Sequence, residues 1–160
     1  MMYRAPHYGG QPIRRHEKPV LLPPPTPLLP PYPLPEKGKY LQKLQVQEVH
    51  RSPGRVRLTM PCTPDHCDEQ GRVHEGAIAS LMDIAGTVAS WTIPQRLNSR
   101  GATVGMMLSF CGSAQEEVTA DACLQQRSEE MFFNTVQITT TATGRLVAMG
   151  NVSYRLLEAR

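Results

Sequence analysis

Residues 68–91, DEQGRVHEGAIASLMDIAGTVASW, contain the pattern that decides the fold of this chain. They predict a tight loop followed by a helix that ends near Trp91 to Pro94. Apolar side chains lie almost all round this helix: Ala77, Ile78, Leu81, Met82, Ile84, Ala85, Val88 and Ala89. A helix without a wide polar face belongs in the interior of a protein.

The polar side chains of this helix form a narrow stripe, which comprises Ser80, Asp83, Thr87 and Ser90. At about 100° per residue these side chains fall within an arc of roughly 80°. A carboxylate on a helix that is otherwise buried is costly unless another group satisfies or uses it. Asp83 is therefore a candidate functional residue. The structural alternative is that Asp83 bonds a loop amide or a neighbouring subunit.

The amino-terminal part of the chain has a different composition from the rest. Eleven of the fifteen prolines lie in residues 1–36. Because proline removes backbone donors and favours extended geometry, this segment has no core of its own. We expect a Pro-rich extended or disordered leader over 1–37 and one folded domain over 38–160. The leader is also a candidate arm for binding a protein partner.

The location of the protein inside the cell stays open at this point. The first sixteen residues carry Arg4, Arg14 and Arg15 and no acid, as mitochondrial transit peptides do. Prolines and the paired glycines Gly9 and Gly10 argue against an amphipathic helix there. The sequence favours an intracellular protein, mitochondrial or otherwise cytoplasmic. No stretch is long and apolar enough to span a bilayer, and a net charge of +3 is too weak to indicate nucleic-acid binding.

The cysteines are Cys62, Cys67, Cys111 and Cys123, too few in a chain of this length for a disulfide framework. We expect reduced thiols. The cluster Cys62, His66, Cys67 and His74 has the spacing C-x3-H-C-x6-H. This spacing matches no common structural zinc site, so we expect no metal.

Strand patterns flank the predicted helix. Before it, residues 39–50 are expected to hold a short helical turn and then a strand at Leu44–His50. A second strand at Arg55–Met60 follows the turn Ser52-Pro53-Gly54. Four strands follow the helix, at Thr103–Phe110, Glu117–Gln126, Met131–Thr143 and Leu146–Leu156. Short turns between consecutive strands predict an antiparallel meander after the helix. The fold class is therefore α+β, and so apolar a helix indicates that a second subunit completes its cover.

The stretch Asp68-x-x-Gly71-x-x-His74-Glu75-Gly76, with Asp83 seven residues later, resembles the hotdog-fold acyl-CoA thioesterases. The likeness is to the branch that holds the phenylacetate-pathway and small THEM-type enzymes, and it runs over about residues 40–157. Gly101-Ala102-Thr103-Val104 and the final hairpin at 143–148 are further matches. The resemblance implies an antiparallel sheet wrapped around one long central helix.

The resemblance also implies an acyl-CoA substrate, no bound cofactor or metal, and a site between the subunits of a homodimer or dimer of dimers. Asp83 would act as general base or nucleophile toward the thioester. His74 would position the acyl carbonyl, and the Thr103 hydroxyl would contact the water or the acid. The backbone N–H groups of Glu75 and Gly76 would stabilise the oxyanion at the positive end of the helix dipole.

Two positions of the motif depart from the family pattern. Asp68 stands where the family usually has Asn, and it is either a further site residue, catalytic with Asp83, or the start of an Asx turn. A second acid near Asp83 could weaken it as a base. Glu75 replaces a glycine and adds bulk and negative charge. The alternative function is therefore a catalytically inactive hotdog subunit with a structural role in a larger protein complex, mitochondrial or otherwise. A hotdog hydratase is less favoured, because no Asp/His pair with its loop spacing is present.

Overall fold

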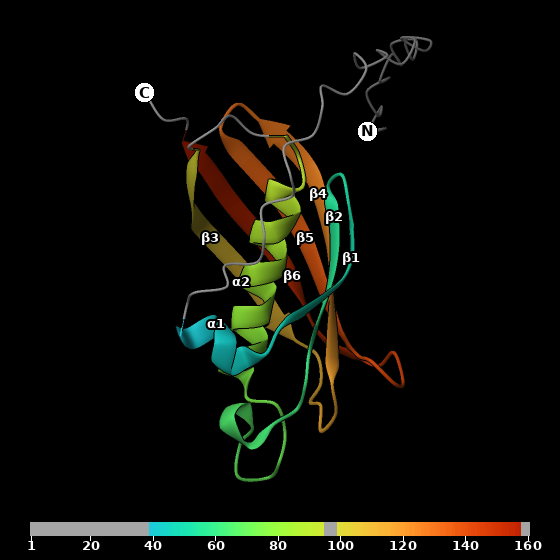
Figure 1. The fold of residues 1–160 in the computed structure, drawn as a ribbon. Coiled ribbons are helices and arrows are strands. Elements are labelled where there is room, and N and C mark those ends of the chain that lie inside the picture. The colour runs from blue at the N-terminus through green and yellow to red at the C-terminus, as the bar shows by residue number, and fades with distance from the viewer. Residues whose placement is uncertain (1–38, 95–98, 158–160) are drawn as a thin grey trace, which may run out of the picture.

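The computed structural model describes residues 39–94 and 99–157 (Figure 1). The expected Pro-rich leader over 1–37 lies outside the described residues and stays a prediction. No helix in the described ranges is long and apolar enough to cross a membrane.

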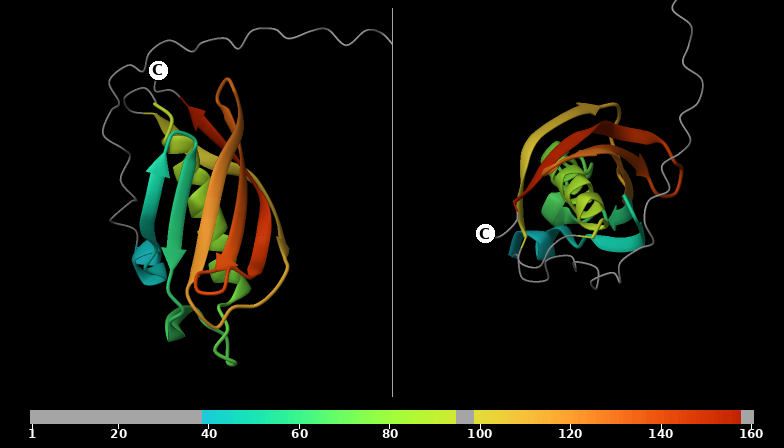
Figure 2. Two further views of the ribbon diagram at one scale, coloured as in Figure 1. Left: turned by 90° about the vertical axis from the view of Figure 1, so that its right-hand side faces the viewer. Right: turned by 90° about the horizontal axis from the view of Figure 1, so that it is seen from above.

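The described residues form two α-helices, a short 3-10 turn and six strands. In chain order these are α1 (Lys39–Leu44), β1 (Gln47–Ser52), β2 (Arg55–Met60), η1 (Pro64–His66), α2 (Glu75–Trp91), β3 (Arg100–Phe110), β4 (Val118–Ser128), β5 (Met131–Thr140) and β6 (Leu146–Leu157). All strand pairs are antiparallel and belong to one sheet, which curls around α2 (Figure 2). The predicted α+β fold, with one long helix against an antiparallel sheet, is confirmed.

The strand order is β1-β2-β4-β5-β6-β3, which corrects the predicted meander at one strand. β4, β5 and β6 do form a meander, but β3 pairs with β6 instead of β4. A strand has only two hydrogen-bonding edges, and both edges of β4 are taken by β2 and β5. Residues 111–117 therefore carry the chain from β3 at one edge of the sheet back to its interior.

The amino-terminal strand is also shorter than its pattern predicted. The prediction began it at Leu44, whereas β1 begins at Gln47 and Leu44 ends helix α1. Leu44 is only 3% exposed and packs into the core. The apolar residues at 41 and 44 therefore belong to a helical face rather than to an alternating strand.

Helix α2 lies in the core as predicted. Its buried residues are Ala77, Ile78, Leu81, Met82, Ala85, Gly86, Val88, Ala89 and Ser90. Gly86 permits the close approach of the helix to the sheet, since a Cβ there would lie 2.5 Å from the Cβ of Val152 on β6. The tight contact fixes the rotation of α2 about its own axis and so decides which side chains face away from the sheet.

Candidate active site

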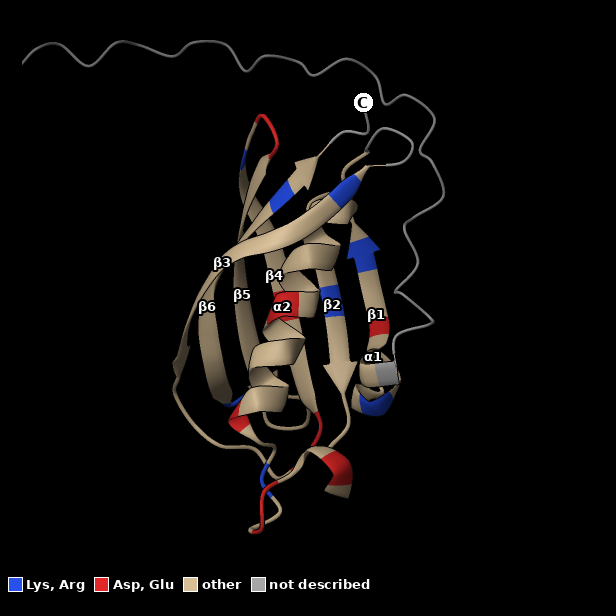
Figure 3. Cartoon of the chain, turned by 90° about the vertical axis from the view of Figure 1, so that its left-hand side faces the viewer, with Lys and Arg blue, Asp and Glu red and all other residues tan. Residues whose placement is uncertain are grey.

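The sheet leaves one side of α2 open, because its edge strands β1 and β3 do not meet. In Figure 3 the helix is visible between β3 on one side and α1 and β1 on the other. The partly exposed residues of this helix, from its second turn onward, are Ala79, Ser80, Asp83, Ile84, Thr87 and Trp91. Three members of the predicted polar stripe thus face this opening. Ser90 does not: it is fully buried, accepts a hydrogen bond from Asn134 and donates one to Gly86 O.

Asp83 and Thr103 are brought together by the structure. The Thr103 hydroxyl on β3 donates to Asp83 Oδ1 at 2.6 Å, and Thr87 Oγ1 lies 3.4 Å from Thr103 Oγ1. Within ranges 39–94 and 99–157, Asp83 Oδ2 has no hydrogen-bond partner. One carboxylate oxygen is therefore fixed in orientation, while the other remains available to a water or a substrate.

The start of α2 presents one free backbone donor. His74 is the N-cap residue, and its Nδ1 accepts the Gly76 N–H at 2.9 Å. Its carbonyl oxygen accepts from Ala77 and Ile78. The N–H of Glu75, at the first helical position, has no partner in the described part of the chain. Of the two predicted oxyanion donors, the one at Glu75 is thus open and the one at Gly76 is occupied by the cap.

Asp68 serves its own loop. Its Oδ1 accepts the backbone N–H groups of Gln70 and Arg72, each at 2.9 Å, and its Oδ2 accepts from Arg72 Nε at 2.7 Å. The backbone N–H of Arg72, helped by its guanidinium, lowers the pKa of Asp68. Gly71 completes the turn at a φ of +71°. These contacts fit the Asx-turn interpretation, and none of them reaches Asp83.

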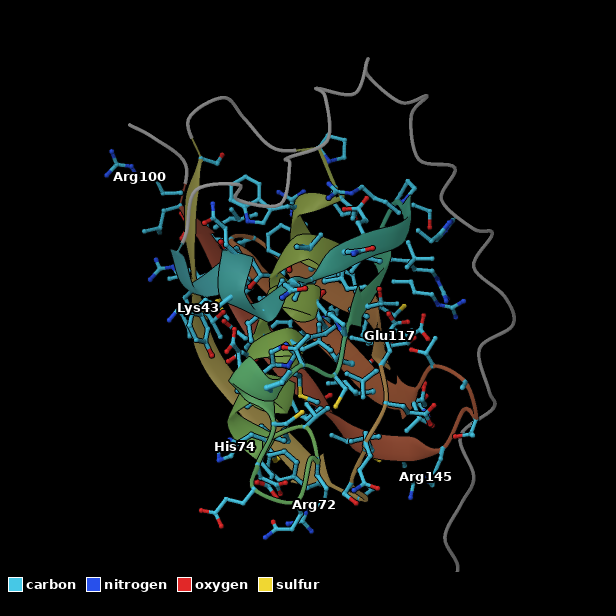
Figure 4. All side chains as sticks on the ribbon, turned by 60° about the horizontal axis from the view of Figure 1, so that its bottom comes forward. Lys43, Arg72, His74, Arg100, Glu117 and Arg145 are labelled. Atoms are coloured by element: carbon cyan, nitrogen blue, oxygen red, sulfur yellow. The ribbon has the colours of Figure 1, made fainter. Side chains whose placement is uncertain are left out.

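Arg72 and His74 lie at the same end of the molecule, on the segment that leads into α2 (Figure 4). Glu75 is exposed to solvent. The loop therefore places His74 and the open Glu75 N–H at one end of the stripe, with Asp83 two turns further along the helix.

Tyr40 on α1 is a site residue that the sequence did not reveal. Its hydroxyl lies 2.6 Å from Ser80 Oγ, and Ser80 Oγ donates to Gly76 O at 2.8 Å. Because the Ser80 hydrogen is used in that bond, Tyr40 is the donor to Ser80. Helix α1 therefore flanks the stripe opposite β3. The sequence predicted a short helical turn in this region, but no motif there indicated that Tyr40 belongs to the site.

The four residues of the zinc-like cluster do not converge on one point, although Cys62 and Cys67 lie side by side. In the described ranges, no group of three or more His, Cys, Asp or Glu side chains is placed to hold a metal ion. His66 is only 7% exposed, and neither ring nitrogen has a hydrogen-bond partner among the described residues. Burial lowers the pKa of His66, which favours the neutral ring.

Comparison with known proteins shows what this chain is similar to. Residues 70–148 match the family model described as the thioesterase superfamily. Over this stretch, which is just under half of its length, the chain is similar to the thioesterase superfamily. The human protein named acyl-coenzyme A thioesterase 13 is 28% identical over 110 residues, which cover 68% of this chain and 77% of that relative. The mouse protein of the same name is 25% identical over 125 residues, covering 77% and 86%.

Solved structures of thioesterase-superfamily proteins share the fold. Zebra fish thioesterase superfamily member 2 aligns with a TM-score of 0.62 and 25% identity, covering 71% of this chain and 81% of that one. A thioesterase family protein from Silicibacter pomeroyi aligns with a TM-score of 0.71 and 20% identity, covering 76% and 91%. The predicted hotdog fold and the family resemblance are both confirmed.

Proposed function

We propose that this protein is an acyl-CoA thioesterase, which hydrolyses an acyl-CoA thioester to the free acid and CoA. The observation that carries the proposal is the Asp83 carboxylate, which lies on the open stripe of an otherwise buried helix. Thr103 holds one of its oxygens and leaves the other unpaired within the described chain. The curated relatives with acyl-CoA thioesterase names support the substrate class.

The residues around the stripe supply each part of a hydrolytic step. Asp83 takes a proton from a water whose oxygen attacks the acyl carbon. Alternatively, its carboxylate attacks that carbon directly and forms a mixed anhydride, which a water then hydrolyses to the free acid, restoring Asp83 and supplying the proton for the leaving thiolate. The Glu75 N–H, at the positive end of the α2 dipole, stabilises the oxyanion that forms. Because it lies two turns, or roughly 12 Å, from Asp83 on the same helix, the donor that acts together with Asp83 comes from a second copy of the chain. His74 positions the carbonyl. The carbon–sulfur bond then breaks, and the CoA thiolate takes up the proton. No cofactor is part of this mechanism.

We further propose that a second copy of the chain covers the β3 edge and completes the site. β3 has no charged residue after Arg100, as its uniform colour in Figure 3 shows. Its exposed apolar residues are Val104, Met106, Met107 and Phe110. The other edge strand, β1, carries the charged pair Glu48 and Arg51. A long, uncharged, apolar edge pairs with another chain unless it is protected, and β3 also carries Thr103.

Light scattering of the full-length protein tests this assembly. We expect a dimer or a dimer of dimers, and dissociation when Met106→Lys places a charge on β3. Val49→Lys is the matched control, because Val49 is an exposed apolar residue on the opposite edge strand. A monomeric wild-type protein would contradict the proposed assembly.

A panel of acyl-CoA substrates tests the activity. Full-length protein should release free thiol from at least one chain length, and Asp83→Ala should abolish release while circular dichroism stays unchanged. Asp121→Ala is the control, since Asp121 lies on β4, between β2 and β5, and pairs with Arg57 instead of facing the stripe on α2. Absence of release from every substrate by folded wild-type protein, with co-purification of a large complex, would instead support the inactive structural subunit.

A further inference from the structure

Two of the cysteines face each other beside the loop that precedes α2. The Sγ atoms of Cys62 and Cys67 are 2.9 Å apart, and both residues are half-buried. Cys111 and Cys123 differ, since within the described ranges their thiols donate hydrogen bonds to backbone carbonyl oxygens and not to another thiol. The candidate active site makes no use of the Cys62 and Cys67 thiols.

The backbone around this pair is held in place by hydrogen bonds. The carbonyl of His66 accepts the His74 N–H at 2.9 Å, and the Asp68 N–H donates to Arg72 O at 2.7 Å. Cys67 itself pairs with Val73 in an antiparallel bridge. Cys62 lies just after the end of β2 at Met60. The two thiols therefore meet where the end of β2 touches the loop that supports the start of α2.

We propose that Cys62 and Cys67 form a redox-active dithiol that closes to an intramolecular disulfide by exchange with a small-molecule disulfide of the glutathione type. A disulfide bond holds its sulfurs at about 2.05 Å, so the existing contact needs only a short approach of the side chains. The rigid backbone on both sides keeps the thiols together, which raises the effective concentration of one at the other.

The exchange proceeds in two balanced steps. The Cys62 thiolate attacks one sulfur of the oxidised small molecule, forming a mixed disulfide and releasing one reduced thiol. Cys67 then attacks the Cys62 sulfur, which forms the internal bond and releases the second reduced thiol. The two protein thiols lose two electrons and two protons, and the small-molecule disulfide gains them.

The environment of the two thiols sets this order of attack. Burial and the hydrogen bond with Cys62 raise the pKa of the Cys67 thiol to about 11. Cys67 is therefore held as a protonated thiol at neutral pH, and the first attack falls to Cys62. Cys67 acts second, when the mixed disulfide lies directly beside it.

The experiment equilibrates the full-length protein in buffers of increasing oxidised-to-reduced glutathione ratio, followed by acid quenching, alkylation and mass spectrometry. We expect a species that lacks two hydrogen atoms, with the bond mapped between Cys62 and Cys67. Closure should need at least about tenfold less oxidised buffer in the folded protein than in urea, because the fold holds the thiols together. The readouts are mass and thiol labelling, so thioesterase activity plays no part in them.

Single substitutions separate the proposed pair from the other cysteines. Cys67→Ser should stop at a mixed disulfide on Cys62, whereas Cys111→Ser and Cys123→Ser should close as the wild type does. Phenylarsine oxide, which binds neighbouring thiols, should protect both cysteines of the folded wild type from alkylation. Glutathione adducts that form independently on both cysteines, or closure at the same buffer ratio with and without urea, would overturn the proposal.

Discussion

The two faces of helix α2 differ in what holds them. The core face packs against the sheet with no spare room, as at Gly86, where an added Cβ would collide with Val152. The opposite face carries Ser80, Asp83 and Thr87, which are only partly buried and are bonded to α1 and β3. The close packing of one face gives the other a fixed orientation. A carboxylate can therefore be positioned for chemistry without taking part in the core.

The largest expected effect is on the open face. Asp83→Asn keeps the shape of the side chain but removes its charge, so it should lower kcat on acyl-CoA by roughly 10²–10⁴-fold. The free energy of unfolding should change by under about 1 kcal/mol, since the residue is outside the core. Steady-state kinetics and urea denaturation on the same preparation check both values. A loss of kcat that is accompanied by a large loss of unfolding free energy would show that Asp83 supports the fold and that the two faces of α2 do not differ in role.

The core face should show the reverse behaviour. Gly86→Ala should destabilise the fold by about 1–3 kcal/mol, because the clash with Val152 outweighs the better helix propensity of alanine. Turnover per folded molecule should stay near the wild-type value. Gly105→Ala on β3 is the matched control, as nothing lies within 4 Å of a Cβ there. Urea midpoints of the two variants give the comparison, and a neutral Gly86→Ala would show that the helix can move.

Thr103→Val tests how the stripe is held from β3. It removes the hydroxyl that donates to Asp83 Oδ1 and keeps a similar volume. A hydrogen bond to a charged group contributes about 1.5–3 kcal/mol, so kcat/KM should fall by roughly ten- to a hundredfold. Thr119→Val is the control, since its hydroxyl contacts Thr141 away from the stripe. An unchanged kcat/KM would remove Thr103 from the proposed mechanism.

The smallest effect is expected in the loop before the helix. Asp68→Asn should change turnover by less than about fivefold, because the half-buried Asp68 carboxylate is bonded within its own loop and none of its hydrogen bonds reaches Asp83. The lowered pKa of Asp68 means that its stabilising contribution is complete above the ordinary value of 3.8 and is lost as the pH falls through the folded-state pKa. Acid titrations of unfolding should therefore be shallower for the variant in that range. A large loss of kcat in Asp68→Asn would instead support a catalytic role for Asp68 together with Asp83.

Sequence patterns predicted the features of the site that lie close together in the chain. The spacing of apolar residues placed Asp83 on the weakly buried face of an interior helix, and the motif placed His74 and Glu75 at its start. The pattern also indicated an Asx turn at Asp68 as one of two roles. Ser90 was assigned to the polar stripe, yet it is buried by Asn134 of β5. Helical geometry gives the angle between residues around the helix, but the packing of the sheet decides which of those residues are exposed.

The sequence by itself determined the interior helix, the antiparallel strands and the position of Asp83 on the polar stripe of that helix, because these depend on local periodicity and turn chemistry. Only the tertiary structure decided that β3 pairs with β6 and that Tyr40 reaches Ser80. The contact between Thr103 and Asp83 was expected from the family resemblance and not from the strand and helix patterns. The tertiary structure also decided that the sulfurs of Cys62 and Cys67 touch. Such contacts depend on side-chain packing across elements. Strand and helix patterns determine which face of an element is apolar, but not which other element packs against that face. For this reason the sequence patterns did not predict these contacts.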